Sequence, residues 1–235
     1  MKRWLAVGGL LFILVLAGCS GGVVSEQALN ASATYSWDTE ATVHVNVTQG
    51  TYRAVYDLDN QSRVELFQRG DLGDENPLPI RAIKFKYRNG TVVDASAITV
   101  SETDSRTVVE LPSPYGKFAY TARFSTGQVF IPTGVKGSYE VVLPPGARMG
   151  IPIISVAEPG GYEKTLRNDR VHLRWENPSR DAITVSYYYQ RDLYLFGGLL
   201  GLLVLVAMAG AVYFKIQLGS LESEREDVDV EEETD

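Results

Sequence analysis

The pattern of hydrophobic and polar positions divides the chain into two uninterrupted apolar runs near its ends and a long segment of short, alternating runs between them. Val43, Val45 and Val47 alternate with polar residues, which is typical of a half-buried strand. Similar strand-like runs occur at 52–58, 64–68, 80–88, 107–111, 117–124, 139–143, 171–175 and 182–189. No sustained helical period interrupts them. The pattern therefore predicts an all-β domain over residues 34–192.

Turn residues separate these runs and favour an antiparallel arrangement. Asn89-Gly90 lies between two strand-like runs, a strong signal for a two-residue hairpin, and Asn168-Asp169 indicates a second hairpin. Short strands separated by Gly and Pro turns are typical of a β-sandwich. Two arrangements remain open, namely one large sandwich or two smaller lobes hinged near residues 112–116.

The apolar run at residues 193–214 predicts a transmembrane helix. It contains no charged residue over 22 positions, or about 33 Å of helix, which is enough to cross a bilayer core of about 30 Å. Aromatic residues at both ends are typical of membrane interfaces. Gly197 and Gly201 lie four residues apart, so they share a helix face on which another helix can approach closely. This face allows a homodimer to form through the transmembrane helix.

The other apolar run follows Met1-Lys2-Arg3 and is typical of a secretory signal. It ends in Leu16-Ala17-Gly18-Cys19, the pattern of a lipobox, and Cys19 is the only cysteine in the chain. We therefore predict a signal peptide at 1–18, a membrane lipid joined to Cys19 by a thioether, and a lipidated tether at 19–33. The alternative is an uncleaved N-terminal anchor. Both interpretations place the β domain outside the cell and residues 215–235 in the cytoplasm, in a single-pass cell-membrane protein.

Composition and charge exclude several classes of function. The formal net charge is −7, but residues 215–235 carry nine acids against two bases, and the remaining 20 acids and 20 bases cancel. The charge therefore belongs to an acidic tail that we expect to be disordered, and the balanced remainder argues against nucleic-acid binding. One cysteine excludes an intrachain disulfide and a cysteine-cluster metal site, and two histidines exclude the usual multi-histidine zinc sites.

Candidate modification sites are more numerous than candidate chemistry. Asn-x-Ser/Thr sequons predict glycosylation, and they lie at Asn30, Asn46, Asn60 and Asn89. His44 and His172 each lie opposite the apolar face of a predicted strand, and we interpret them as exposed polar residues. The carboxylate clusters around Asp57 and Asp71 lack the spacing of a calcium loop and are interpreted as polar loops. We predict no catalytic residue, no metal site and no cofactor.

The order of these parts resembles an uncharacterised family of haloarchaeal membrane lipoproteins, a domain of unknown function. The resemblance covers the lipobox, the all-β domain, Trp175-Glu176-Asn177-Pro178, the Tyr-Tyr-Tyr-Gln-Arg-Asp approach to the apolar run, and the acidic tail. It implies a compartment and an architecture but no catalytic residue. In an archaeon it also implies that the lipid on Cys19 is an archaeol-type ether lipid.

The function expected from the sequence is that of a surface lipoprotein without enzymatic activity. Its domain would bind or support another envelope or membrane protein. The alternative is a ligand-capturing accessory subunit of a transporter or secretion complex, and an enzyme ranks third. An apolar pocket would favour the ligand hypothesis, and an exposed apolar patch would favour the interaction hypothesis. A cleft with clustered titratable groups would favour an enzyme.

Overall fold

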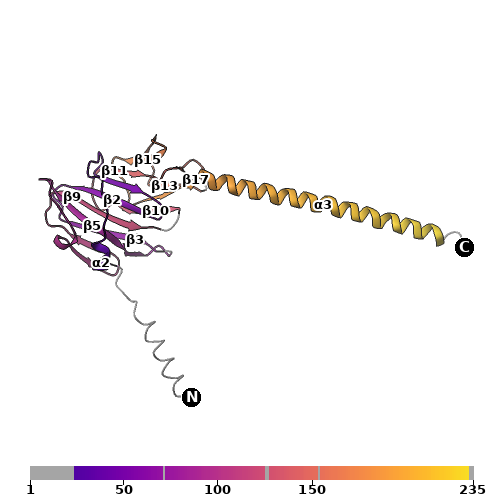
Figure 1. Ribbon diagram of the computed structural model, residues 1–235, viewed down its shortest axis with the longest axis horizontal. Coiled ribbons are helices and arrows are strands. Elements are labelled where there is room, and N and C mark those ends of the chain that lie inside the picture. The colour runs from indigo at the N-terminus through magenta and orange to yellow at the C-terminus, as the bar shows by residue number, and fades with distance from the viewer. Residues whose placement is uncertain (1–23, 71, 125–126, 153, 233–235) are drawn as a thin grey trace, which may run out of the picture. The chain divides into compact units, whose positions relative to one another are not determined.

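The computed structural model describes residues 24–70, 72–124, 127–152 and 154–232, with side chains described up to Lys215. The chain divides into two compact units, one ending at Tyr188 and one beginning at Tyr189, and each is described by itself (Figure 1). The predicted signal peptide 1–18 and Cys19 lie outside the described residues, so their roles stay predictions.

The first unit is built on an eight-stranded sheet, as the alternating runs predict. All its neighbouring strands are antiparallel except β1 and β11, which pair in parallel with Val43 opposite Tyr139. The antiparallel prediction is therefore wrong at this pair, because β11 reaches β1 by a long connection through the other layer. The strand order across the sheet is β14 (Glu163–Arg167), β15 (Arg170–Trp175), β11 (Tyr139–Val142), β1 (Val43–Val47), β2 (Thr51–Leu58), β9 (Gly116–Arg123), β5 (Ile80–Tyr87) and β6 (Val92–Val93).

Two smaller sheets form the second layer. One has the order β4 (Glu75–Pro77), β3 (Arg63–Arg69), β8 (Thr107–Glu110) and β7 (Thr99–Glu102), and the other β10 (Gln128–Pro132), β16 (Ala182–Ser186) and β13 (Ala157–Glu158). They meet where the rings of Phe67 and Phe130 lie 5.3 Å apart, edge to face. The Tyr56 hydroxyl donates to Pro132 O at 3.4 Å and links the two layers. A short 3-10 helix, Ala95–Ala97, and the pair of β12 (Ala147–Arg148) with β17 (Tyr188–Tyr189) complete the elements.

Aromatic side chains fill the space between the layers. Tyr52, Tyr56, Phe118 and Tyr120 come from β2 and β9 and are buried, and the Tyr56 and Tyr120 hydroxyls lie 3.1 Å apart. Burying such a side chain contributes about 1.5–3 kcal/mol, so each of the four adds to the hydrophobic stabilisation of the domain. The residues up to Tyr188 form one compact unit, so the β domain has one lobe rather than two.

The two predicted hairpins are confirmed. Asn168 and Asp169 both have positive φ and form a two-residue turn between β14 and β15, which pair Arg167 with Arg170. Between β5 and β6 the loop is one residue longer than expected, because Gly90 takes φ +90° at the end of a turn and its N–H bonds Tyr87 O at 2.9 Å.

The segment before the first strand crosses the outer face of the large sheet. It begins with the short helix α2 (Glu26–Leu29) and continues as an extended strap, residues 33–37. The buried Tyr35 covers Val55 and Ala119, and its hydroxyl donates to Ala82 O at 2.6 Å. The ammonium group of Lys84 donates to Ala33 O at 2.9 Å, and that of Lys117 donates to Trp37 O at 2.8 Å, which ties the strap to the sheet. Residues 34–42 belong to the predicted β domain but form no strand, and the carbonyl groups of Thr34 and Trp37 accept from the side chains of Arg53 and Lys117.

Several strands carry too weak a pattern to be predicted. All residues of β14 are at least partly exposed, because it is an edge strand, and so it lacks the alternation that marked the others. β10 ends in Pro132, and β4, β12 and β13 have only two or three residues. Short strands of this kind are defined by their partners in the sheet rather than by their own sequence.

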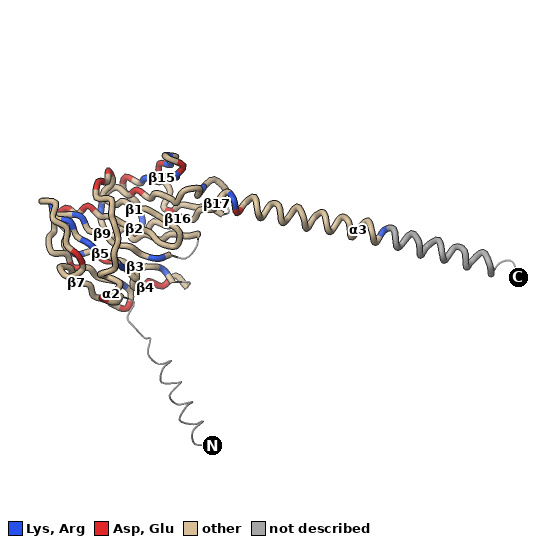
Figure 2. Tube along the Cα trace, in the orientation of Figure 1, with Lys and Arg blue, Asp and Glu red and all other residues tan. Residues whose placement is uncertain are grey.

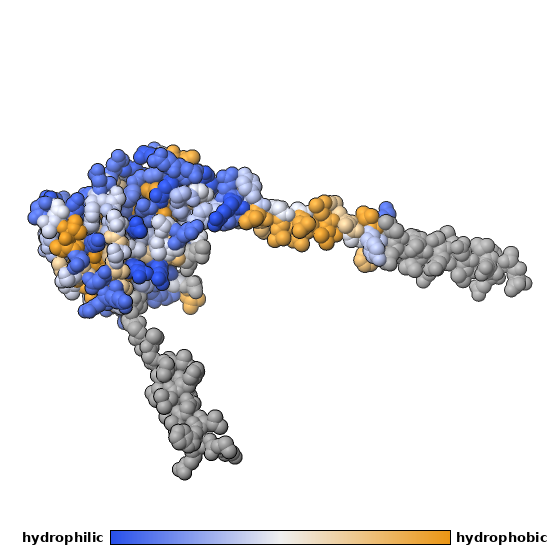
Figure 3. All heavy atoms as spheres, viewed as in Figure 1, coloured by the Kyte–Doolittle hydropathy of each residue, from blue (hydrophilic) through white to orange (hydrophobic). Residues whose placement is uncertain are grey.

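The second unit is the helix α3 (Gln190–Glu232). Its segment Gln190–Lys215 is long and apolar enough to cross a membrane, and its apolar side chains are exposed. The sequence has no charged residue between Asp192 and Lys215, and Figure 2 shows an uncharged stretch in this part of α3 that Figure 3 shows as largely hydrophobic. These observations are consistent with one membrane span. The helix continues to Glu232, so the expectation of a disordered tail is wrong for the described part. Its Glu residues are good helix formers.

Candidate functional site

The sandwich has two opposite ends that carry different loops. At the first, which we call the cleft end, β1 and β9 begin and β2 and β10 finish. At the second, the exit end, β9 finishes at Arg123, β10 begins at Gln128 and β16 finishes at Ser186. Ser186 is four residues before Gln190, so the exit end is where the chain leaves the domain.

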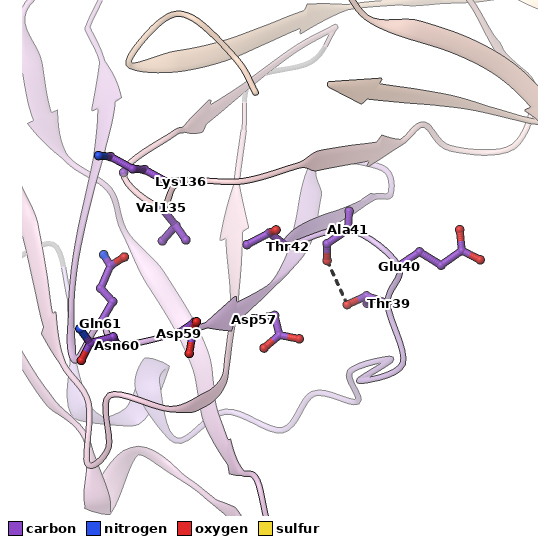
Figure 4. Close-up of a pocket in the computed structure, with 11 residues that line it drawn as sticks. Thr39, Glu40, Ala41, Thr42, Asp57, Asp59, Asn60, Gln61, Val135 and Lys136 are labelled. Atoms are coloured by element: carbon purple, nitrogen blue, oxygen red, sulfur yellow. Dashed lines mark hydrogen bonds between the residues drawn. The ribbon is translucent and has the colours of Figure 1, made fainter. Parts of the chain in front are cut away.

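An open cleft of about 680 Å³ lies at the cleft end. Three loops form it, one before β1, one after β2 and one after β10. Figure 4 shows Val135 and Lys136 across the cleft from Asp57 and Asp59, while Glu40 points away. Polar loops therefore converge from both layers of the sandwich on one concave surface.

Ion pairs hold the acidic side of the cleft in place. Lys117 Nζ lies 3.2 Å from an Asp57 carboxylate oxygen, and Arg88 donates to Asp59 at 3.1 Å. Both carboxylates are exposed to solvent, so each pair contributes at most about 1 kcal/mol, and the main effect of the pairs is to orient the carboxylates. Asn60, with φ +58°, turns the chain beside them, and Tyr115 OH reaches its side chain at 3.5 Å.

The lining of the cleft is rich in hydrogen-bonding groups. Carboxylates and the amides of Asn60 and Gln61 offer acceptors and donors, and Lys136 adds one cation. The hydroxyl groups of a glycan and the polar surface of a protein both match such a lining. Among the residues that the structure describes, no group of three or more His, Cys, Asp or Glu side chains could hold a metal ion.

A second polar cluster, which the sequence did not reveal, lies on the outer face of the large sheet. Glu140 accepts a hydrogen bond from His44 Nδ1 through one oxygen and from His172 Nδ1 through the other, each at 2.9 Å. The three residues come from β1, β11 and β15, and their side chains are only 13–19% exposed. His44 and His172, interpreted from the sequence as exposed residues, are therefore half-buried and linked.

The electrostatics of this cluster favour an ionised carboxylate. Burial by itself would raise the pKa of the Glu140 carboxyl, but hydrogen bonds from His172 and His44 and their attraction outweigh it and lower the pKa. Each imidazole bonds a different oxygen of Glu140, so the hydrogen bonds link three neighbouring strands and do not direct all three side chains at one shared site. Beside it Arg170 donates to Asn46 Oδ1 at 2.7 Å and to Leu143 O at 2.7 Å. The cluster is best described as structural.

Only strand pairing could have revealed this cluster. His44, Glu140 and His172 each occupy the polar positions of an alternating strand, so the sequence places each on an outer face. The register that brings His44 opposite Glu140 joins residues 96 positions apart. Among single-sequence signals, the rarity of histidine in the chain was the sole hint.

The four predicted glycosylation sites lie in different surroundings. Asn30, Asn60 and Asn89 are exposed in turns or loops, and Asn60 lines the cleft. Asn46 lies on the face opposite the valines, as the alternation indicates, but it is half-buried in β1 and accepts from Arg170. Glycosylation at each of the four stays a prediction.

Gly197 and Gly201 lie on one face of α3, and a Cβ at either position would meet nothing within 4 Å. That face is therefore open to another helix. Dimerisation through it stays a prediction.

The comparisons with known proteins place the chain in a family without assigning it a role. A family model described as "Family of unknown function (DUF5803)" matches residues 39–233, which include most of the β domain and the whole of α3. No curated protein and no solved structure matches. The match confirms that the relatives of this sequence are an uncharacterised family, while the haloarchaeal source stays a prediction. Because the match covers more than half of this chain, the chain belongs to the family of unknown function DUF5803.

Proposed function

We propose that this chain is a non-enzymatic binding and support module of the cell envelope. A lipid on Cys19 and the span in α3 hold it at the membrane, and the β domain lies outside the cell. The cleft at the end of the sandwich opposite the exit end binds another envelope component. The observation that carries the proposal is the placement of the cleft at that opposite end, formed by three loops.

The connection between the domain and the span supports this orientation. Three residues separate Ser186 from Gln190, and a fully extended connection covers at most about 14 Å. A span beginning at Gln190 therefore keeps the exit end near the membrane surface. The cleft lies at the other end of the sandwich from this connection, so the connection leaves it open to a component of the envelope.

A second candidate is a ligand-capturing accessory subunit of a transporter or secretion complex. The size of the cleft favours it, since about 680 Å³ falls within the usual range of small-molecule sites. Its polar and open lining fits a larger partner better, because small-ligand sites are mostly apolar and enclose their ligand. The envelope-partner hypothesis is therefore preferred.

Site-specific photocrosslinking in intact membranes tests the proposal. A photoreactive residue at Lys136, which is exposed in the cleft, should capture a discrete envelope component. The same residue at Glu163, exposed on the edge strand β14, is the matched control and should not capture it. The experiment is repeated without residues 216–235, to show whether capture needs the acidic tail. Equal labelling at both positions, or none at Lys136, would contradict a binding role for the cleft.

A further inference from the structure

The exit end carries a basic groove that the proposed envelope-binding cleft does not use. Two adjoining hollows of about 710 and 560 Å³ share Gln68, Arg123 and Phe124, so they form one continuous groove. Arg69 lines the first hollow and Arg81 the second. Three arginines, Arg69, Arg81 and Arg123, therefore line one groove together with Phe124.

The charge of the groove is largely uncompensated. Among the described residues, neither Arg81 nor Arg123 has a carboxylate within ion-pair distance, and Arg69 lies 3.8 Å from the half-exposed Asp181. Glu158 is the acidic residue of the lining, and its carboxylate is paired with Arg180 at 2.5 Å. The domain as a whole is nearly neutral, so the groove is a local basic site and favours an anion.

Apolar side chains accompany the arginines. Phe124 and Phe130 are partly exposed in the groove, and the Arg69 guanidinium lies 5.7 Å from the centre of the Phe130 ring. Val156, 44% exposed, lines the same groove, and Leu72 at the tip between β3 and β4 is 97% exposed. Cations beside exposed apolar groups are typical of surfaces that contact the headgroup region of a bilayer.

The two ends of the domain's chain border this groove. Ala28 of α2 lines one hollow and Ser186 of β16 lines the other, and in Figure 1 α2, β3 and β10 follow one another along this side. Ala28 is nine residues after Cys19, the predicted lipid attachment, and Ser186 is four residues before Gln190. Anchors attached at both borders would hold the groove against the membrane.

We propose that the groove of Arg69, Arg81 and Arg123 binds the phosphate groups of anionic membrane lipids, with Leu72 and Val156 inserted among the headgroups. This inference rests on the proposed membrane anchoring. Guanidinium groups bind phosphate oxygens through two parallel hydrogen bonds, which suits them to lipid phosphates. The contact fixes the orientation of the domain above the bilayer, in addition to the two covalent tethers.

Hydrogen–deuterium exchange on the full-length chain in nanodiscs tests this. Discs of phosphatidylcholine alone are compared with discs that contain increasing fractions of phosphatidylglycerol. Peptides from β3 and β9, covering residues 64–70 and 118–124, should exchange more slowly in the anionic discs. For Arg123→Gln, the anionic-lipid fraction that gives half of this protection should rise about fivefold, the usual effect of one arginine near a charged membrane. Arg63→Gln is the matched control and should leave the fraction unchanged, because Arg63 is exposed at the start of β3 and lines neither the groove nor the cleft.

Two further arms identify the ligand. Inorganic phosphate added to phosphatidylcholine discs should leave exchange unchanged, and equal protection by phosphate would overturn the lipid assignment. Equal exchange in neutral and anionic discs, or an equal effect of both substitutions, would also overturn it. Co-elution of the chain with the discs is measured separately, so a failure of membrane anchoring is distinguished from a failure of lipid binding. Crosslinking at Lys136 is unaffected by either result.

Discussion

Removing the carboxylate of Glu140 should destabilise the β domain and change its response to acid. Glu140→Ala deletes the acceptor of two hydrogen bonds, each 2.9 Å long, and leaves His44 and His172 without that partner. A hydrogen bond to a charged group contributes about 1.5–3 kcal/mol, and the side chains retain a little contact with water. The expected loss is therefore about 3 kcal/mol, or roughly 6–12 °C in Tm for a domain of this size. Glu140→Gln preserves the shape and should lose about half as much.

The pH dependence of this effect has a definite sign. The pKa of Glu140 is lower in the folded protein than its ordinary 4.5, so the unfolded chain binds the proton more readily. Its contribution to stability is complete above pH 4.5 and is lost as pH falls through the lower folded-state pKa. The difference in Tm between the natural protein and Glu140→Gln should therefore narrow below pH 4.5.

Thermal unfolding of the full-length chain, followed by tryptophan fluorescence, measures both effects, because Trp175 is buried in the domain. Glu102→Gln is the matched control, since Glu102 is exposed in β7 and makes no ion pair with any described residue. Equal Tm values for the Glu140 and Glu102 variants at pH 7, or a Tm difference independent of pH, would refute the reasoning.

Three other substitutions test the packing, each by thermal unfolding of the full-length chain. Tyr35→Phe removes the hydrogen bond from the Tyr35 hydroxyl of the strap to Ala82 O of the sheet. It should lower the free energy of unfolding by about 1–2 kcal/mol and speed proteolysis before residue 38. Unchanged cleavage would contradict the strap's role. Tyr139→Phe should cost about 1 kcal/mol, because it removes the hydrogen bond from the Tyr139 hydroxyl to Val135 O. Tyr52→Phe should cost less, because no described group lies within 3.5 Å in hydrogen-bonding geometry of the buried Tyr52 hydroxyl; equal losses would contradict this. Gly137→Ala should destabilise clearly, because Gly137 has φ +132° and a Cβ would overlap Thr42; an unchanged Tm would argue against that close approach.

The all-β class and the hairpin at Asn168-Asp169 could be predicted from the sequence because both depend on local physics. Alternation such as Val43, Val45 and Val47 reports which face is buried, and each of these residues is indeed buried. Asn and Asp tolerate the left-handed conformation that a two-residue hairpin requires. The apolar segment 193–214 was likewise readable, since length and composition alone determine whether a helix can cross a membrane.

The polar sites required the tertiary structure. The cleft joins loops from three parts of the chain, and the groove joins Arg69, Arg81 and Arg123 from three strands, so neither has a local signature. His44 and Glu140 meet because β1 and β11 pair in parallel, a register set by packing between the layers. Hydrophobic alternation specifies which face of a strand is buried, but it does not specify which strand lies beside it. The sequence by itself therefore determined the class of fold and the apolar segment that can span a membrane, and only the tertiary structure decided which polar residues act together.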